Sequence, residues 1–288
     1  MLDDRTRPLE HQGRRLKAIV MIFSPLWMLG AFALTAHAEV SRCFAMAGLS
    51  PRVVAVRLQQ AAIGAEQVRI TYVGHATFRI ETAQGVTIAT DYSGFAGAGP
   101  VPDVVTMNHA HATHYTDFID PKIKHVLRGW NPTGGPARHH LKVADVLIRN
   151  VPTDIRLGLD RREKDGNSIF IFEVAGLCIG HLGHLHHELA PEDIGAIGQL
   201  DVIMAPVDGT YTLNHASMVR TLQVLKARLI IPMHAFGPYT LAQFVKRMGE
   251  QFDVQNSDIS TVTLSVAELP TRQTILVIPE SGPMPSFE

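Results

Sequence analysis

The chain has 288 residues, of which 46% are hydrophobic and 18% charged, with a mean hydropathy of +0.09. This composition is typical of a folded globular protein and excludes a disordered, collagen-like or disulfide-scaffold chain. Lys and Arg number 26 against 27 Asp and Glu, a net charge of −1 without an extended basic stretch, so we expect no nucleic-acid partner.

The N-terminal segment has the order of features found in export signals. Basic residues at positions 14, 15 and 17 precede the apolar run 18–36, which ends in the small-x-small tripeptide Ala36-His37-Ala38. We therefore expect residues 1–38 to be a cleaved signal peptide, leaving a periplasmic or secreted protein with no stable membrane association. An uncleaved membrane anchor is the alternative, because the run approaches the ~20 apolar residues of a spanning helix.

The remaining chain divides into a helical segment and a domain rich in short strands. Residues 39–67 contain helix-like spacing at 53–62 and predict an N-terminal helix that packs on the main domain, residues 68–288. In an oxidising compartment, Cys43 and Cys178 can form a single disulfide bridge.

From Val68 onward, short β-type runs alternate with turn residues. The predicted strands are Val68–Val73, Thr77–Glu81, Val86–Thr90, Val104–Met107, Val143–Val151, Ser168–Val174, Leu177–Gly180, Asp201–Ala205, Leu229–Ile231 and Thr274–Ile278. The predicted helices are Pro191–Gln199 and His215–Ala227. This pattern indicates packed sheets flanked by helices, and the glycine-rich loops 94–102 and 129–136 are lid hypotheses.

Three predicted strands end in histidines. One strand runs into an H-x-H-x-x-H group at residues 109–114, and two others end in the run 181–187 and in residue 234. Imidazoles at this spacing can converge on one metal ion from a loop. The predicted metal ligands are His109, His111, His114, His184 and His234. Consecutive His186 and His187 must point in different directions, so neither is assigned to the site.

Several of these segments resemble the metallo-β-lactamase superfamily. The matching segments are Ile70–Ile80, Thr87–Asp91, the H-x-H-x-x-H group, Gly180–His184 and Ile230–His234. The likeness covers about residues 68–278 and points to the branch similar to ascorbate-6-phosphate lactonase and uncharacterised metal-dependent hydrolases. It implies a fold of the α/β class, a four-layer αββα sandwich with the metal site at one edge.

The resemblance also implies roles beyond the ligands. Asp91 matches the strand-end Asp that orients a ligand histidine in the family, with a turn cap as the alternative. His75 lies in a loop that approaches the site in this branch, as a substrate contact or a structural hydrogen bond. Asp208 and Tyr211 follow another strand, and they either line the pocket or serve as a turn Asp and a packed Tyr.

The chain departs from the family pattern at the acidic ligands. Thr113 stands where the H-x-H-x-D-H motif has its Asp, and His184 stands where the family has a bridging Asp. At an effective dielectric of ~20, two +2 ions ~4 Å apart repel by about 10 kcal/mol or more. We therefore expect one divalent ion, zinc before iron or manganese, and at most a weak second one.

Together these features predict a secreted metal-dependent hydrolase. It would act on a small-molecule substrate, an ester, lactone or phosphoester, through a metal-bound hydroxide. Two alternatives stay open: a mononuclear iron oxidoreductase on the same fold, and a non-catalytic protein that binds a metal or ligand after losing the acidic ligands. The oligomeric state stays open as well.

Overall fold

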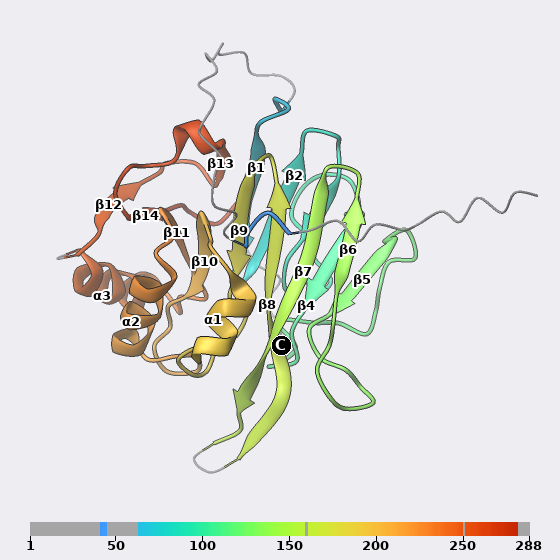
Figure 1. The fold of residues 1–288 in the computed structure, drawn as a ribbon, viewed down its shortest axis with the longest axis horizontal. Coiled ribbons are helices and arrows are strands. Elements are labelled where there is room, and N and C mark those ends of the chain that lie inside the picture. The colour runs from blue at the N-terminus through green and yellow to red at the C-terminus, as the bar shows by residue number, and fades with distance from the viewer. Residues whose placement is uncertain (1–40, 45–62, 159–160, 250, 282–288) are drawn as a thin grey trace, which may run out of the picture. The chain divides into compact units, whose positions relative to one another are not determined.

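Two β-sheets packed against each other carry the fold (Figure 1). The computed structural model describes residues 41–44, 63–158, 161–249 and 251–281, so the predicted signal peptide and the helix at 53–62 lie outside the described residues. The strands of the smaller sheet are β1 (Val68–Gly74), β2 (Thr77–Thr82), β3 (Thr87–Ala89), β4 (Val104–Met107), β5 (His125–Arg128) and β13 (Thr261–Leu264). Those of the larger sheet are β6 (His140–Val143), β7 (Val146–Arg156), β8 (Arg162–Val174), β9 (Leu177–His181), β10 (Val202–Pro206), β11 (Leu229–Met233), β12 (Asp253–Asn256) and β14 (Thr274–Val277).

The order of strands is β13-β1-β2-β3-β4-β5 in the six-stranded sheet and β12-β14-β11-β10-β9-β8-β7-β6 in the eight-stranded sheet. All ten predicted strands are present, and β5, β6, β12 and β13 are additional. Alternate residues of β1, such as Val68 and Ile70, face alternate residues of β8, such as Phe170 and Phe172, in the core between the sheets. This is the period of two that a sheet with one buried face requires.

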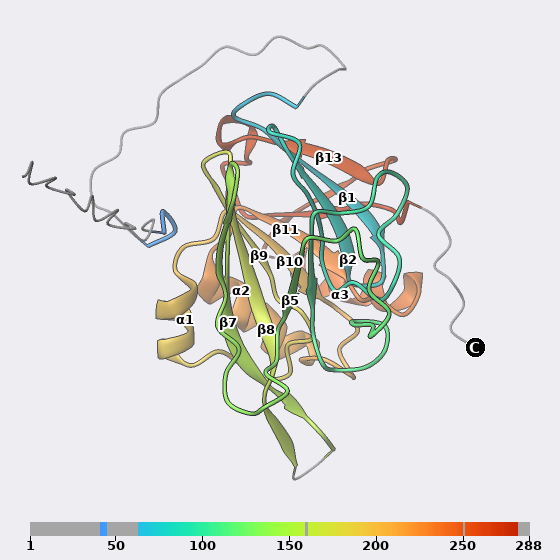
Figure 2. The same cartoon turned by 90° about the vertical axis from the view of Figure 1, so that its right-hand side faces the viewer.

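Three helices cover the outer face of the eight-stranded sheet (Figure 2). They are α1 (Pro191–Ile197), α2 (His215–Leu225) and α3 (Pro238–Met248), and a short 3₁₀ helix spans Val266–Glu268. The Asn214 side chain caps α2 by accepting a hydrogen bond from the Ser217 backbone N–H, and Met218 and Leu222 then face the sheet. No helix in the described ranges has both the length and the apolar character needed to cross a membrane.

The outer face of the six-stranded sheet is covered by loops. Tyr92 and Ala96 from the β3–β4 loop and Ile123 from the β4–β5 loop pack on Val105 and Met107. The predicted arrangement, two packed sheets with helices on the outside, is confirmed. In the described part of the chain, loops rather than helices form the fourth layer.

The topology brings several strand ends to one edge. Strands β9, β10 and β11 are mutually parallel, and β3 is parallel to β4. Parallel strands end at the same edge of a sheet, and the residues that follow them therefore gather there. Asp91, His111, His184, Asp208 and His234 all follow such ends.

A short N-terminal segment is tied to the eight-stranded sheet. A disulfide joins Cys43 to Cys178 in β9. The Glu173 carboxylate in β8 accepts hydrogen bonds from the Ser41 hydroxyl, from the Arg42 backbone N–H at 2.8 Å and from Arg149 Nε at 2.9 Å. The segment at 41–44 is therefore part of the packed domain.

Candidate metal centre

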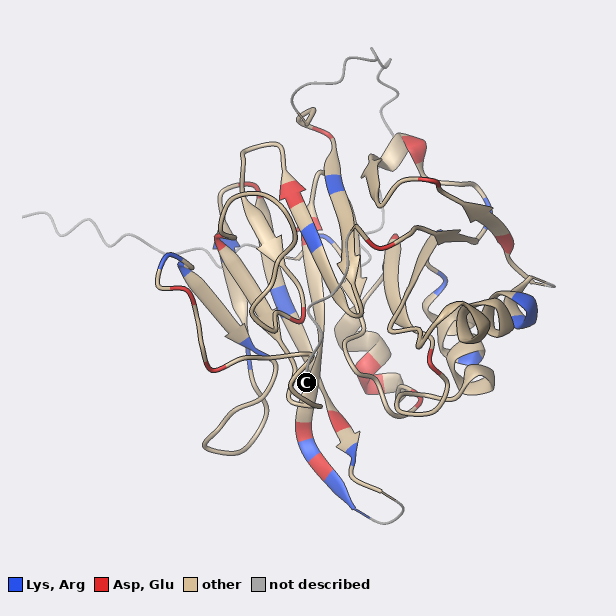
Figure 3. Ribbon diagram, turned by 180° about the vertical axis from the view of Figure 1, so that it is seen from behind, with Lys and Arg blue, Asp and Glu red and all other residues tan. Residues whose placement is uncertain are grey.

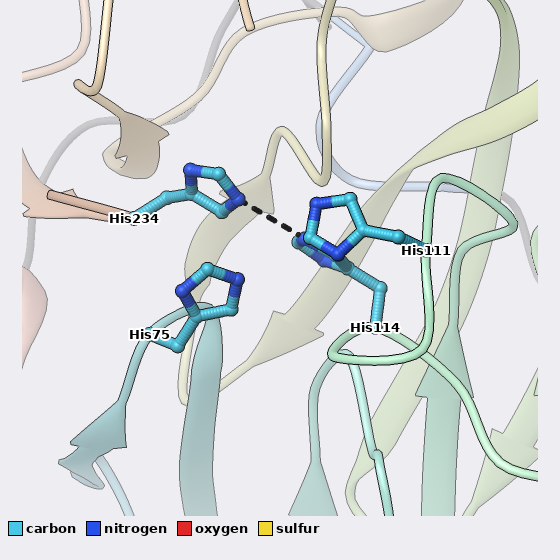
Figure 4. A group of neighbouring side chains, drawn as sticks. All are labelled: His75, His111, His114 and His234. Carbon is cyan, nitrogen blue, oxygen red and sulfur yellow. Dashed lines mark hydrogen bonds between the residues drawn. The ribbon is translucent and has the colours of Figure 1, made fainter. Parts of the chain in front are cut away.

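Five histidines from the two sheets converge where the strands end. One ligand nitrogen from each of His75, His111, His114 and His234 lies within 4.8 Å of the others (Figure 4). His184 joins them, because its Nε2 lies 3.1 Å from the Nε2 of His111. The Nε2 atoms of His114 and His234 are 3.2 Å apart. Two imidazole nitrogens on one tetrahedral zinc ion lie roughly 3.3 Å apart, so both pairs have a spacing that fits a shared ion.

Carboxylates fix two of these rings by contacting their Nδ1 atoms, on the side away from the cluster. Asp91 Oδ2 lies 2.6 Å from Nδ1 of His114, and Asp208 Oδ2 lies 3.0 Å from Nδ1 of His234. An Nδ1–H that donates to a carboxylate leaves Nε2 with a lone pair. The contact drawn as a dashed line in Figure 4 then brings two lone pairs together, an arrangement that a cation between them would stabilise.

The rings of His111 and His184 have neutral partners on Nδ1. Thr113 Oγ1 lies 2.6 Å from Nδ1 of His111, and His186 Nε2 lies 2.7 Å from Nδ1 of His184. In these four rings, of His111, His114, His184 and His234, the Nδ1 is therefore fixed by a neighbour, and the Nε2 is available to the cluster. This is the arrangement by which outer partners orient metal ligands.

Both carboxylates are fully committed to this orienting task. Asp91 is completely buried, and its Oδ1 accepts a hydrogen bond from Asn108 at 2.8 Å; burial raises its pKa to about 6. Asp208 Oδ1 accepts hydrogen bonds from the backbone N–H groups of residues 210–212. Burial by itself would raise the pKa of Asp208, but hydrogen bonds from His234 and Thr212 outweigh it and hold that pKa well below its usual range. Neither carboxylate is therefore left to serve as a metal ligand or a base.

Burial favours the neutral form of His75, His111, His114 and His184. It lowers the pKa of His75 to about 3, assisted by the neighbouring His234 and His111, and it lowers the pKa values of His111, His114 and His184 as well. Metal ions bind the neutral imidazole, so the ring nitrogens can coordinate at pH 7 without first losing a proton. The donor set thus fits a divalent ion that prefers nitrogen ligands, such as zinc.

Strained backbone conformations accompany the cluster. His75, Asp91 and His234 have φ angles of +54°, +40° and +55°. Non-glycine residues adopt this region at a cost, and such residues concentrate at functional sites. The His75 carbonyl is anchored by the backbone N–H of His234 at 2.6 Å and by the Tyr72 hydroxyl at 2.9 Å.

His109, a predicted ligand, is not among the histidines that this cluster groups together. Its Nδ1 is 2.5 Å from Glu163 Oε1, and its ring stacks on Trp130 with centroids 4.8 Å apart. The reason is that the His109 backbone N–H donates to the Gly166 carbonyl on β8, while a turn from His111 to His114 redirects the chain. The first histidine of the motif therefore faces the β7–β8 ribbon.

The other predicted residues lie at or near the site. His111, His114, His184 and His234 are in the cluster, and Asp91 lies directly behind His114. Tyr211 is 63% exposed and lines a pocket beside the cluster.

Sequence reasoning left three contributors unassigned or open. His75 lies among the ligand nitrogens, Asp208 orients His234, and His186 orients His184. The sequence did carry a signal for the orienting role of Asp208, because this residue follows β10 just as Asp91 follows β3. His181, in contrast, is structural: its Nε2 contacts the Ala76 carbonyl at 2.8 Å, and its Nδ1 accepts from the Gly183 backbone N–H.

A two-sheet sandwich with a histidine cluster at its strand-end edge defines the class of metal-dependent hydrolases with a metallo-β-lactamase fold. The model of the beta-lactamase superfamily domain matches residues 69–234, more than half of the chain. The chain belongs to this superfamily.

Similar proteins from other organisms support the assignment to this superfamily. An Archaeoglobus fulgidus protein named a UPF0173 metal-dependent hydrolase is 24% identical over 235 residues, covering 70% of this chain and 97% of the relative. A Pyrococcus furiosus protein of the same name is 27% identical over 219 residues, covering 65% and 95%. The structure of a Thermotoga maritima protein, described as a candidate Zn-dependent hydrolase of the metallo-β-lactamase superfamily, aligns with a TM-score of 0.53 and 29% identity over 73% of this chain and 98% of that one.

Proposed function

We propose that this protein is an exported metal-dependent hydrolase that cleaves a small ester, lactone or phosphoester with one divalent ion, zinc first. The observation that carries the proposal is the set of four imidazoles whose Nδ1 atoms are held from behind and whose Nε2 atoms face one another. A bound divalent ion would lower the pKa of water and polarise the attacked oxygen of the substrate.

The protein's own residues divide the remaining tasks. His111, His114, His184 and His234 would hold the ion, while Asp91 and Asp208 fix the rings of His114 and His234. Because both carboxylates are already hydrogen-bonded through both oxygens, neither is free to take a proton from water. We therefore expect slow turnover, or a substrate that supplies its own proton acceptor.

The disulfide supports the export part of the proposal. A bridge between Cys43 and Cys178 persists in oxidising compartments and is rare in the cytosol. N-terminal sequencing of protein purified from an exporting host should therefore begin at or near Glu39. Soluble cytoplasmic protein that retains residues 1–38 would overturn the export proposal.

The hydrolase proposal is tested by loading the protein with zinc, manganese or iron and assaying lactones, carboxylic esters and phosphoesters. His111→Ala and His234→Ala should lose both bound metal and turnover. His140→Ala, at an exposed position on β6, replaces a histidine outside the cluster and should retain both.

One alternative is favoured by a specific observation. Thr113 and His184 occupy the two positions where the family pattern has acidic ligands, which is consistent with a metal-binding protein that has lost hydrolysis. Full metal occupancy with no turnover of any substrate class would establish that alternative and exclude the hydrolase.

A further inference from the structure

An open pocket of about 280 Å³ lies against the histidine cluster, on the side of the β7–β8 ribbon. His111 and His184 form part of its wall, and Arg156 and Tyr211 form another part. This volume is just below the ~300–1,000 Å³ typical of small-ligand sites, so the pocket suits a small molecule. A small molecule in the pocket would therefore contact the predicted metal ligands and Arg156 together.

Arg156, the last residue of β7, is fixed at one end of its guanidinium. Its Nη2 donates to the carbonyl of Thr210 at 3.0 Å and to those of Tyr211 and Thr212 at 3.5 and 3.4 Å. Within the described ranges, its Nε and Nη1 have no hydrogen-bond partner. A guanidinium held in this way keeps free N–H groups, which suit the oxygens of a carboxylate or phosphate.

The described residues that line the pocket offer hydrogen-bond donors. No Asp or Glu of the described residues lines it. His186, another wall residue, is nine-tenths buried, and its Nδ1 lacks a partner in the part of the chain that the structure describes. When Nε2 of His184 holds a metal ion, its Nδ1–H donates to Nε2 of His186 at 2.7 Å, and the proton of His186 then resides on the unpartnered Nδ1. A buried donor without an acceptor calls for a ligand or water nearby.

The positive charge at the pocket comes from Arg156 itself and not from a broad basic surface. Along the start of β8, basic and acidic residues alternate as Arg162, Glu163, Lys164 and Asp165 (Figure 3). Their fields largely cancel at a distance, whereas Arg156 stands directly in the wall of the pocket.

We propose that this pocket binds the anionic group of the substrate, a carboxylate or a phosphate, through Arg156 and presents the adjoining bond to His111 and His184. The apolar walls formed by Ala110, Ile155 and Leu157 then accommodate a short apolar part of the same molecule. The cleavage of that bond rests on the proposed function, but the anion site does not.

The test is calorimetric titration of the zinc-loaded protein with inorganic phosphate and with succinate, using neutral succinamide as the uncharged match. Arg156→Gln should weaken the binding of the recognised anion about tenfold or more. Arg162→Gln is the matched control, because Arg162 is the cross-strand neighbour of Arg156 and does not line the pocket. Arg162→Gln should change the affinity for the anion by less than about twofold. The zinc content should be equal in the parent protein and in both variants.

The two anions separate a phosphate site from a carboxylate site. Equal affinity in Arg156→Gln, an equal loss in Arg162→Gln, equal binding of succinamide, or no binding of either anion would each overturn the proposal. Because the readout is binding, the result is independent of turnover. A protein that binds the anion through Arg156 but hydrolyses nothing would retain this site and lose only the hydrolase function.

Discussion

The Nδ1 of His184 and the Nε2 of His186 lie 2.7 Å apart in the buried interior of the site. One imidazole thereby orients another, in the way that Asp91 orients His114. His184 is therefore oriented by a neutral imidazole, which adds no negative charge to the site.

Removing this orienting ring should weaken metal binding. His186→Ala leaves His184 free to rotate, and loss of such a partner typically lowers metal affinity about 10–100-fold. Competition with a chelator measures the change. His187→Ala is the control, since the hydrogen bonds of His187 within the described residues go to backbone groups of Asp154 and Glu188, and it should leave the affinity within about twofold. Equal affinities in the two variants would contradict the role of His186.

For metal binding, the hydroxyl group of Thr113 should matter more than the shape of its side chain. Its Oγ1 lies 2.6 Å from Nδ1 of His111 and 2.9 Å from Nε2 of His75, so a single hydroxyl fixes both rings. Thr113→Val, which keeps the shape, should weaken metal binding about tenfold or more. Thr113→Ser, which keeps the hydroxyl, should stay within about threefold of the parent protein. If the valine variant binds metal as well as the serine variant, the hydroxyl has no orienting role.

One metal ion per chain should survive exhaustive dialysis against metal-free buffer. The imidazole ligands bring no negative charge, and Asp91 and Asp208 contact the Nδ1 atoms of His114 and His234 rather than lying between two ions. Two divalent ions ~4 Å apart would then repel by about 10 kcal/mol or more. Elemental analysis gives the stoichiometry. Two retained equivalents would show that another carboxylate, Asp117 or Asp154 for example, has taken the missing role.

The metal-free protein should lose stability in acid. Folded pKa values of about 3 for His75 and about 4 for His186 lie below the unfolded value near 6.5, and the pKa values of His111, His114 and His184 are also lowered. Between these values the unfolded chain binds more protons, so stability falls as the pH drops below about 6.5.

Asp91 acts in the opposite direction. Its folded pKa of about 6 lies above the unfolded value of 3.8, so it favours the folded state as the pH falls from 6 to 4. One carboxyl is outweighed by several histidines. The thermal midpoint of the metal-free protein should therefore decrease between pH 7 and pH 5, and a constant or rising midpoint would show that the histidines are protonated in the folded state.

The disulfide should contribute strongly to stability. It joins cysteines 135 positions apart, for which the chain-entropy model gives about 5 kcal/mol, and removing a native disulfide typically costs about 2–5 kcal/mol. Replacing both Cys43 and Cys178 with Ser should lower the melting temperature by roughly 5–20 °C. Adding a reductant to the parent protein should give a similar decrease and should leave the double variant unchanged. An unaltered melting temperature in the double variant would mean that the bridge constrains nothing.

Local pattern in the sequence predicted ten of the described strands and two of the helices, together with the strand ends that carry the histidines. The runs that became β9 and β11 are buried on both faces and almost wholly apolar, so the sequence alone shows where they stop and that histidines follow. The edge strands β12 and β13 carry polar, half-exposed residues and lack that signal. Helix α3 was not among the predicted helices, although the sequence carries a signal for it. Pro238 stands at its start, and apolar residues follow at helical spacing: Leu241, Phe244, Val245 and Met248.

Only the tertiary structure decided which loop side chains meet. His109 and His111 are two residues apart, yet one faces Glu163 and the other faces His184, because a backbone hydrogen bond to Gly166 turns the first one outward. His75 enters the cluster from a turn between β1 and β2 in a left-handed conformation that long-range hydrogen bonds hold in place. The direction of a loop side chain depends on contacts with distant segments, which spacing along the chain does not encode.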